Sequence, residues 1–132
     1  MASAEIRFDH VHLVARDPLE TAQWYADMLG GQIWKRVEVR GAPQVYVAFG
    51  ESYVIVRGQR GAEAIGDKAE RTWGIDHFGV RVNGDFDVFC RTLKERGVVF
   101  DMEPTDFNPS TRIAFIQAPD GVSVELLNRK PA

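Results

Sequence analysis

One short phrase of sequence occurs twice in this chain. Residues 8–14 read Phe-Asp-His-Val-His-Leu-Val and residues 75–81 read Ile-Asp-His-Phe-Gly-Val-Arg, so the Asp-His pair returns after 67 residues (77 − 10). A glycine follows each of these histidines at the same interval of 20 residues (30 − 10 and 97 − 77). Self-similarity at a fixed interval is the signature of a repeated structural unit. We therefore expect two copies of one unit, with His10 and His77 at equivalent places.

Both copies also show the same order of predicted elements. Alternating apolar and polar residues indicate strands, whereas apolar residues spaced by three and four positions indicate helices. The first copy predicts a strand over 8–14, a helix over 17–29 and strands over 33–39, 44–49 and 53–56; the second predicts a strand over 76–82, a helix over 85–96 and strands over 98–102, 112–117 and 122–127. Each copy is thus expected to be βαβββ.

The length of 132 residues fits one α+β domain. We expect a first module over residues 6–58, a linker over 57–74 and a second module over 75–128. A four-stranded sheet that carries a helix on one face leaves its other face open. Two such modules are expected to form a cup-shaped, eight-stranded mixed sheet.

Composition excludes several classes of protein. The net charge is −3 and the Lys and Arg residues are scattered, which argues against nucleic-acid binding. No run of eighteen apolar residues is present, so no membrane span is expected. A single cysteine, Cys90, cannot form an internal disulfide, and it lies on the apolar stripe of the second predicted helix. We expect Cys90 to fill the core and the chain to be cytoplasmic.

The repeat resembles the vicinal oxygen chelate superfamily, which includes glyoxalase I, methylmalonyl-CoA epimerase, extradiol dioxygenases, fosfomycin-resistance transferases and bleomycin-binding proteins. The resemblance covers about residues 6–128, and its most specific pieces are residues 9–11, 24–30, 75–77 and 114–126. It implies a glyoxalase-like fold, a small-molecule substrate and a homodimer. In small two-module relatives, the ligands of one site can come from two chains.

The resemblance also implies a metal site. Strand alternation and the family pattern together direct His10, His77 and Glu125 into one cavity, because the residues between them face the helices. Two imidazoles and one carboxylate leave coordination positions open and suit Fe²⁺ first, with Mn²⁺, Zn²⁺, Ni²⁺ and Co²⁺ as alternatives. Many relatives have a fourth ligand at the end of the first module, where this chain has only residues 53–56, Tyr-Val-Ile-Val. This departure argues against a four-ligand glyoxalase I.

Further residues are candidates for catalysis and substrate binding. His12 lies two residues after His10 and therefore points to the same face of the predicted strand. It is the candidate general base or hydrogen-bond donor. A buried neutral imidazole in a structural role is the competing interpretation of His12. Candidate substrate-binding residues are Arg81, Tyr46, Arg112 and Trp34.

The sequence therefore predicts a metal-dependent enzyme that chelates neighbouring oxygens of a small substrate. A lyase or isomerase needs a base, which favours His12, whereas the three-ligand set favours an extradiol-type ring-cleaving dioxygenase. Two alternatives remain, which are a metal-free binding protein of the bleomycin-resistance type and a fosfomycin-type thiol transferase. The residues identify neither the substrate nor the native metal.

Overall fold

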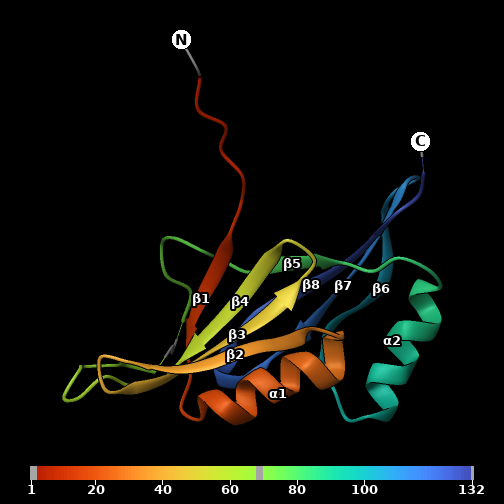
Figure 1. The fold of residues 1–132 in the computed structure, drawn as a ribbon. Helices are drawn as coiled ribbons and strands as arrows, with labels where there is room; N and C mark the ends of the chain where they lie inside the picture. Colours follow the sequence, from red (N-terminus) through yellow and green to blue (C-terminus); the bar gives the residue numbers. More distant parts are fainter. Residues whose placement is uncertain (1–2, 68–69, 132) are drawn as a thin grey trace. The chain divides into compact units, whose positions relative to one another are not determined.

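The computed structural model describes residues 3–67 and 70–131, and the chain divides into two compact units, unit 1 (residues 1–66) and unit 2 (residues 67–132). Figure 1 shows each unit as a sheet with one helix. The predicted linker, 57–74, includes residues 68 and 69, which lie outside the described residues.

Unit 1 is a four-stranded mixed sheet with one helix. Its elements are β1 (His10–Val14), α1 (Pro18–Leu29), β2 (Gln32–Val39), β3 (Ala42–Phe49) and β4 (Ser52–Arg57). The strand order is β1-β4-β3-β2, in which β1 is parallel to β4 and the other neighbours are antiparallel.

Unit 2 repeats this plan. Its elements are β5 (Phe78–Arg81), α2 (Phe86–Glu95), β6 (Phe100–Asn108), β7 (Thr111–Gln117), a short 3₁₀ turn (Pro119–Gly121) and β8 (Ser123–Arg129). The order β5-β8-β7-β6, with β5 parallel to β8, matches the order of unit 1. The predicted α+β fold of two βαβββ modules is confirmed.

Each helix begins where a side chain caps it. The Asp17 carboxylate accepts a hydrogen bond from the backbone N–H of Glu20, and Pro18 occupies the first turn of α1. In unit 2, the Asp85 carboxylate accepts from the backbone N–H of Val88 and starts α2 in the same way. Gly30 ends α1 in the left-handed conformation, with φ of 77°.

The helices cover one face of each sheet and build two cores. In unit 1 the fully buried side chains include Tyr25 from α1 and Val45, Val47 and Val56 from the sheet. In unit 2, Cys90 and Leu93 of α2 are buried together with sheet residues, as predicted for Cys90. The buried sheet residues of unit 2 include Ala114, Ile116, Val124 and Leu126. The alternate residues of the strands belong to the opposite face, which no helix described for the same unit covers.

Two boundaries differ from the prediction. The strand expected over 98–102 is β6, which runs to Asn108 and includes Pro104. A proline is tolerated there because β6 is an edge strand, and its pairing with β7 shifts register in this region. The break between the strands predicted over 33–39 and 44–49 is a two-residue turn at Arg40 and Gly41, which both have positive φ. Val39 and Ala42 on either side of the turn already pair with each other.

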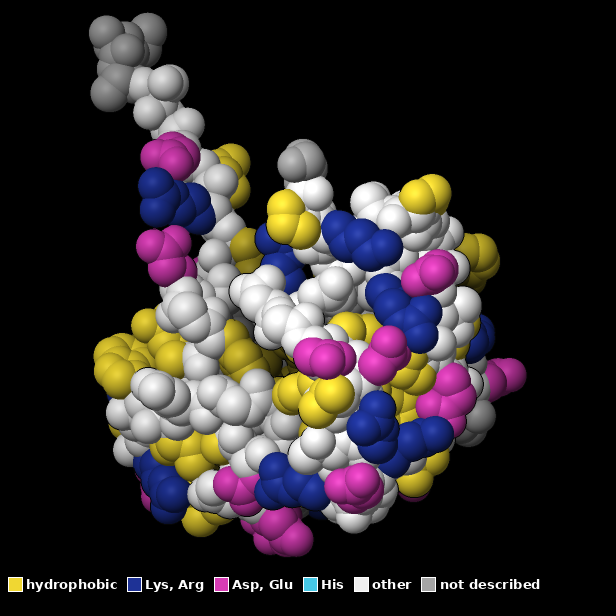
Figure 2. All heavy atoms as spheres, turned by 90° about the vertical axis from the view of Figure 1, so that its right-hand side faces the viewer, with side chains coloured by type: hydrophobic (Ala, Val, Ile, Leu, Met, Phe, Trp, Pro, Cys, Tyr) yellow, Lys and Arg dark blue, Asp and Glu magenta, His cyan; other side chains and the backbone are white. Residues whose placement is uncertain are grey.

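The surface mixes both signs of charge. On the face drawn in Figure 2, Lys and Arg side chains alternate with Asp and Glu side chains, and small apolar patches lie between them. Within residues 3–67 and 70–131, no helix has the length and apolar character needed to cross a membrane.

Candidate functional site

Two of the predicted metal ligands lie together in unit 2. His77 directly precedes β5, and Glu125 lies in β8 beside Gly79. The Nε2 atom of His77 is 2.9 Å from Oε1 of Glu125. Both side chains are partly covered, with exposed fractions of 29% and 20%. The parallel pairing of β5 and β8 thus brings together two donors that are 48 residues apart in the chain.

A third residue orients this histidine. Oδ2 of Asp76 lies 2.8 Å from Nδ1 of His77. The hydrogen bond to Asp76 raises the pKa of His77 against the opposing effect of burial, and Glu125 raises that pKa further. A carboxylate that binds one ring nitrogen directs the other nitrogen outward, which is the usual support of a metal-bound histidine. Here the outward nitrogen, Nε2, faces Glu125.

The separation of these donors fits a shared cation. Two ligand atoms at about 2.1 Å from one ion, with a right angle between them, lie about 3 Å apart. The 2.9 Å between His77 Nε2 and Glu125 Oε1 agrees with this value. An imidazole nitrogen and a carboxylate oxygen also match the donor types that Fe²⁺, Mn²⁺ and Zn²⁺ accept. The two atoms form a hydrogen bond with one another, and their types and spacing also fit two of the three predicted ligands.

The third predicted ligand, His10, belongs to unit 1 and has the same kind of support. Oδ2 of Asp9 lies 2.7 Å from Nδ1 of His10. The repeated Asp-His pair thus produces the same contact in both units. Among the described residues, no three His, Cys, Asp or Glu side chains gather as a complete metal cluster, and the three-ligand set stays a prediction.

His12 shares the open face of unit 1 with His10. Their ring centroids are 6.0 Å apart, and the planes meet at 72°. Burial lowers the pKa of His12, and the positive charges of Arg57, His10 and Arg60 lower it further. An imidazole with a lowered pKa is neutral at neutral pH, the form in which it can accept a proton.

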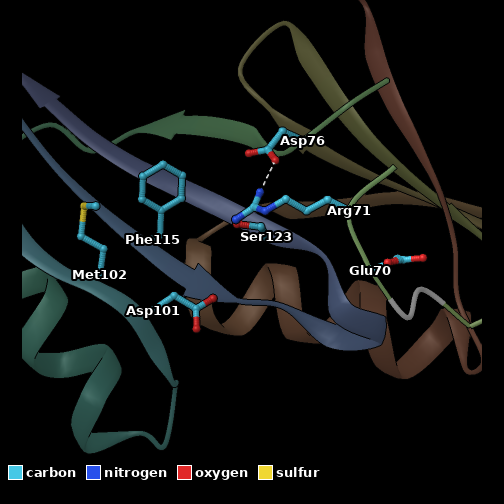
Figure 3. Close-up of a pocket in the computed structure, with 7 residues that line it drawn as sticks. All are labelled: Glu70, Arg71, Asp76, Asp101, Met102, Phe115 and Ser123. Atoms are coloured by element: carbon cyan, nitrogen blue, oxygen red, sulfur yellow. Dashed lines mark hydrogen bonds and ion pairs between the residues drawn. The ribbon is translucent and has the colours of Figure 1, made fainter. Parts of the chain in front are cut away.

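A cavity of about 540 Å³ lies beside the His77–Glu125 pair. Figure 3 shows Phe115 and Met102 on one side of it and Arg71, Ser123 and Asp76 on another. The Phe115 ring also contacts the His77 ring edge-on, with centroids 4.9 Å apart. The cavity lining is completed by Glu70 and Asp101. The pocket therefore combines an apolar wall with charged groups next to the candidate ligands.

An ion pair connects this pocket to the histidine. Nη1 of Arg71 lies 2.6 Å from Oδ1 of Asp76, and the other oxygen of Asp76 contacts His77. Figure 3 shows the Arg71 guanidinium between Asp76 and Ser123. Arg71 is highly exposed, so it can exchange Asp76 for an anionic group of a ligand at little cost.

The four predicted substrate-binding residues lie in different surroundings. Tyr46 and Trp34 are neighbours on the open face of unit 1, with ring centroids 5.7 Å apart. Arg81 is exposed on β5. Arg112 shares the face of β7 on which Ala114 and Ile116 are buried, which is the helix-covered face. Its guanidinium binds Asp87 and Asp106.

Several site residues were not anticipated from the sequence. Asp9 and Asp76 were part of the repeated phrase, and their position before each histidine was the signal that could have found them. Phe115 could have been placed from strand alternation, because it pairs with Glu125. Arg71 lies in an irregular segment with no periodic pattern, so no sequence signal pointed to it.

Comparisons with known proteins agree with the fold. A family model described as "Glyoxalase/Bleomycin resistance protein/Dioxygenase superfamily" matches residues 7–126. No curated protein matches the chain significantly.

Solved structures with the same fold are numerous. A glyoxalase family protein from Bacillus cereus has a TM-score of 0.82 and 19% identity, and the match covers 99% of each chain. A glyoxalase/bleomycin resistance protein/dioxygenase domain from Frankia has a TM-score of 0.77 and 20% identity over 96% of this chain and 100% of that chain. The trypanothione-dependent glyoxalase I of Leishmania major has a TM-score of 0.74 and 20% identity over 94% of this chain and 87% of that chain. At these identities the likeness shows the fold.

Proposed function

Because the chain belongs to the Glyoxalase/Bleomycin resistance protein/Dioxygenase superfamily, we propose that it is a metal-dependent enzyme acting on a small molecule. In this proposal His10, His77 and Glu125 hold one divalent ion, with Fe²⁺ preferred over Mn²⁺, Zn²⁺, Ni²⁺ and Co²⁺. The observation that carries the proposal is the 2.9 Å approach of His77 Nε2 to Glu125 Oε1. Asp76 supports it by fixing the imidazole orientation.

The bound ion would act as a Lewis acid toward neighbouring oxygens of the substrate. Pocket residues of unit 2 would bind and orient the substrate beside His77 and Glu125. Phe115 and Met102 supply an apolar wall for its carbon skeleton, and Ser123 supplies a hydroxyl. Phe115 also restricts the His77 ring through its edge-on contact, so the same side chain serves the substrate and the ligand.

His12 is the proposed general base or hydrogen-bond donor. Its ring lies 6.0 Å from the ring of His10, on the same face of unit 1. In a lyase or isomerase it would take a proton from a carbon next to a substrate carbonyl. In a ring-cleaving dioxygenase it would instead donate a hydrogen bond to a substrate oxygen. We keep both reaction classes.

Metal analysis of matched variants tests the ligand assignment. We expect protein purified without oxygen to contain one divalent ion per site, and His77→Ala and Glu125→Gln to lose it while keeping their circular dichroism. Glu103→Gln is the matched control, because Glu103 pairs with Lys94 on the surface. Metal content that survives both ligand substitutions would refute the assignment.

The identity of the ion separates the reaction classes. Iron would support oxygen chemistry, and nickel, zinc or manganese would support lyase, isomerase or transferase chemistry. A chain that binds no divalent ion under any of these conditions would support the alternative of a metal-free binding protein of the bleomycin-resistance type. We further propose a homodimer, which light scattering after gel filtration would reveal as twice the chain mass of 14.8 kDa.

A further inference from the structure

On the open face of unit 1, an irregularity in the pairing of β2 with β3 brings the side chains of two successive residues together. In a regular strand, successive residues point to opposite faces. The pairing of β2 with β3 shifts register between Ile33 and Lys35. As a result Trp34 and Lys35 both reach the same ring, that of Tyr46. Bulges of this kind often redirect a side chain next to a functional site.

The rings on this face form a cluster of three. The centroid of Trp34 lies 5.7 Å from that of Tyr46 and 5.4 Å from that of Tyr53. The Tyr46 and Tyr53 centroids are 6.4 Å apart. Trp34 nevertheless remains 57% exposed. The cluster thus offers an aromatic surface to solvent, and a flat ring can stack on it.

The position of Tyr46 in this cluster is fixed by polar contacts. Its hydroxyl oxygen accepts a hydrogen bond of 2.9 Å from Nε2 of Gln44, a residue that is only 6% exposed. Oε1 of Gln44 in turn accepts from Nη2 of Arg60, at 3.2 Å. These contacts hold the ring in place before a ligand arrives, which reduces the entropy lost on binding.

A cation lies over the aromatic cluster. The Lys35 ammonium is 4.6 Å from the Trp34 centroid and 4.5 Å from the Tyr46 centroid. Lys94 of unit 2 also lies over a ring, that of Phe100, but it is paired with Glu103. No carboxylate among residues 3–67 and 70–131 forms such a pair with Lys35. Its charge is therefore available to a ligand.

A second basic group, Arg60, is linked to this cluster through Gln44, and the carboxylate beside it, that of Glu63, also binds Arg57. The Nε–H of Arg60 is buried and has no hydrogen-bond partner within the described part of the chain. Arg57, in contrast, is neutralised by both carboxylate oxygens of Glu63, at 2.7 and 3.0 Å. Positive charge thus accumulates beside the aromatic rings, and an anion is the complementary ligand.

We propose that Trp34, Lys35, Tyr46 and Tyr53 form a binding site for an aromatic carboxylate. The ring of the ligand stacks on Trp34 and Tyr53, and its carboxylate receives a charge-assisted hydrogen bond from the Lys35 ammonium. The proposal deepens the proposed function, since Trp34 and Tyr46 are predicted substrate-binding residues. Its test is nevertheless independent of the metal, because none of the four residues is a proposed metal ligand.

Nuclear magnetic resonance tests this site with benzoate as the probe and a chelator present. The indole N–H signals of Trp24, Trp34 and Trp73 are three reporters in one molecule, and single Trp→Phe variants assign them. We expect benzoate to shift the Trp34 signal saturably and to leave the other two unchanged. Benzyl alcohol should bind about tenfold more weakly, since it lacks the charge. Acetate, which has no ring, should not shift Trp34.

Lys35→Met separates the charge from the shape of the site, because methionine keeps an unbranched apolar side chain. This variant should bind benzoate about tenfold more weakly and benzyl alcohol unchanged. Lys94→Met removes the same charge elsewhere and should bind both as the parent does. The proposal is overturned if Trp34 does not respond, if benzylammonium binds as well as benzoate, or if Lys35→Met binds benzoate normally. A Trp34 signal that shifts on dilution of the protein alone would also overturn it, in favour of a contact between chains.

Discussion

Ile55 and Glu125 occupy equivalent positions in the two units. Glu125 pairs with Gly79, which lies two residues after His77, and Ile55 pairs with His12, which lies two residues after His10. The carboxylate of one unit thus corresponds to an apolar side chain in the other. The register therefore identifies Ile55 as the residue of unit 1 that corresponds to the proposed ligand Glu125. Ile55 is 5% exposed, so it fills space there.

Ile55→Glu is expected to rebuild the missing pair at a cost in stability. The new carboxylate would be buried without a cation, which should lower the free energy of unfolding by on the order of 3 kcal/mol. Zn²⁺ should recover part of this loss, because His10 lies on the same face. Thermal unfolding with and without Zn²⁺ measures both effects. Ile55→Gln is the uncharged control and should not respond to Zn²⁺; an equal response would contradict the prediction.

Asp76→Asn should weaken metal binding without removing a ligand. The amide oxygen of asparagine accepts a weaker hydrogen bond from the His77 imidazole than the carboxylate does. Loss of such support typically reduces metal affinity by about 10–100-fold. Titration of the chelator-treated protein with Zn²⁺ measures this change. Asp101→Asn, which alters another pocket carboxylate, is the control and should retain the parent affinity. Unchanged binding in Asp76→Asn would show that the contact is dispensable.

His12→Ala should reduce turnover while leaving the metal in place. A lost acid–base group typically costs about 10²–10⁴-fold in rate. Metal content and turnover are to be measured on the same preparation, with His77→Ala as the variant that should lose both. Normal turnover in His12→Ala would return this residue to a structural role, and loss of metal would make it a ligand.

Cys90 should be unreactive in the folded protein. Burial, with a smaller contribution from Asp87, raises the pKa of its thiol to about 11, so almost no thiolate exists at neutral pH. We expect iodoacetamide to leave the native chain unlabelled in mass spectrometry and to add one group after unfolding. Cys90→Ser should remain unlabelled in both states. Rapid labelling of a chain with native circular dichroism would disprove the burial argument.

The Arg57–Glu63 pair should stabilise the fold only while the glutamate is ionised. The hydrogen bond from Arg57 lowers the pKa of Glu63 in the folded state. Its stabilising effect is therefore complete above the ordinary glutamate pKa and is lost as the pH falls through the lowered value. Glu63→Gln should reduce the free energy of unfolding at neutral pH and make no difference in strong acid. Glu38→Gln, on exposed β2, is the control and should leave the free energy of unfolding at neutral pH nearly unchanged.

The repeated phrase and the helix signals predicted most of the fold because they are local. Asp17 and Asp85 cap the helices that were predicted over 17–29 and 85–96, and a capping side chain bonds within its own turn. The length of β6 could not be predicted, because a proline such as Pro104 usually ends a strand. It is tolerated in β6 only because β6 lies at the edge of the sheet, which the sequence does not show. The orientation of Arg112, in contrast, could have been predicted, because it alternates in phase with the apolar residues Ala114 and Ile116.

The site was predictable where strand alternation and the repeat defined it. His77 and Glu125 were expected on one face, and the parallel pairing of their strands brings them together. In the aromatic cluster of unit 1, Trp34 and Tyr46 were predicted as substrate-binding residues, whereas Lys35 was not. The shift of register at Trp34 overrides the alternation that would have placed Lys35 on the opposite face.

The pairing of first and last strands sets the order in which each unit can fold. His10 pairs with Tyr53, 43 residues later (53 − 10), and Phe78 pairs with Val124, 46 residues later (124 − 78). The antiparallel strands between them are joined by short turns and can form early, whereas the parallel contact must close a loop that spans nearly the whole unit. During synthesis, β1 therefore emerges first but finds its partner last. We expect that closure to limit the folding rate of unit 1, and to be complete before β8 of unit 2 has been made.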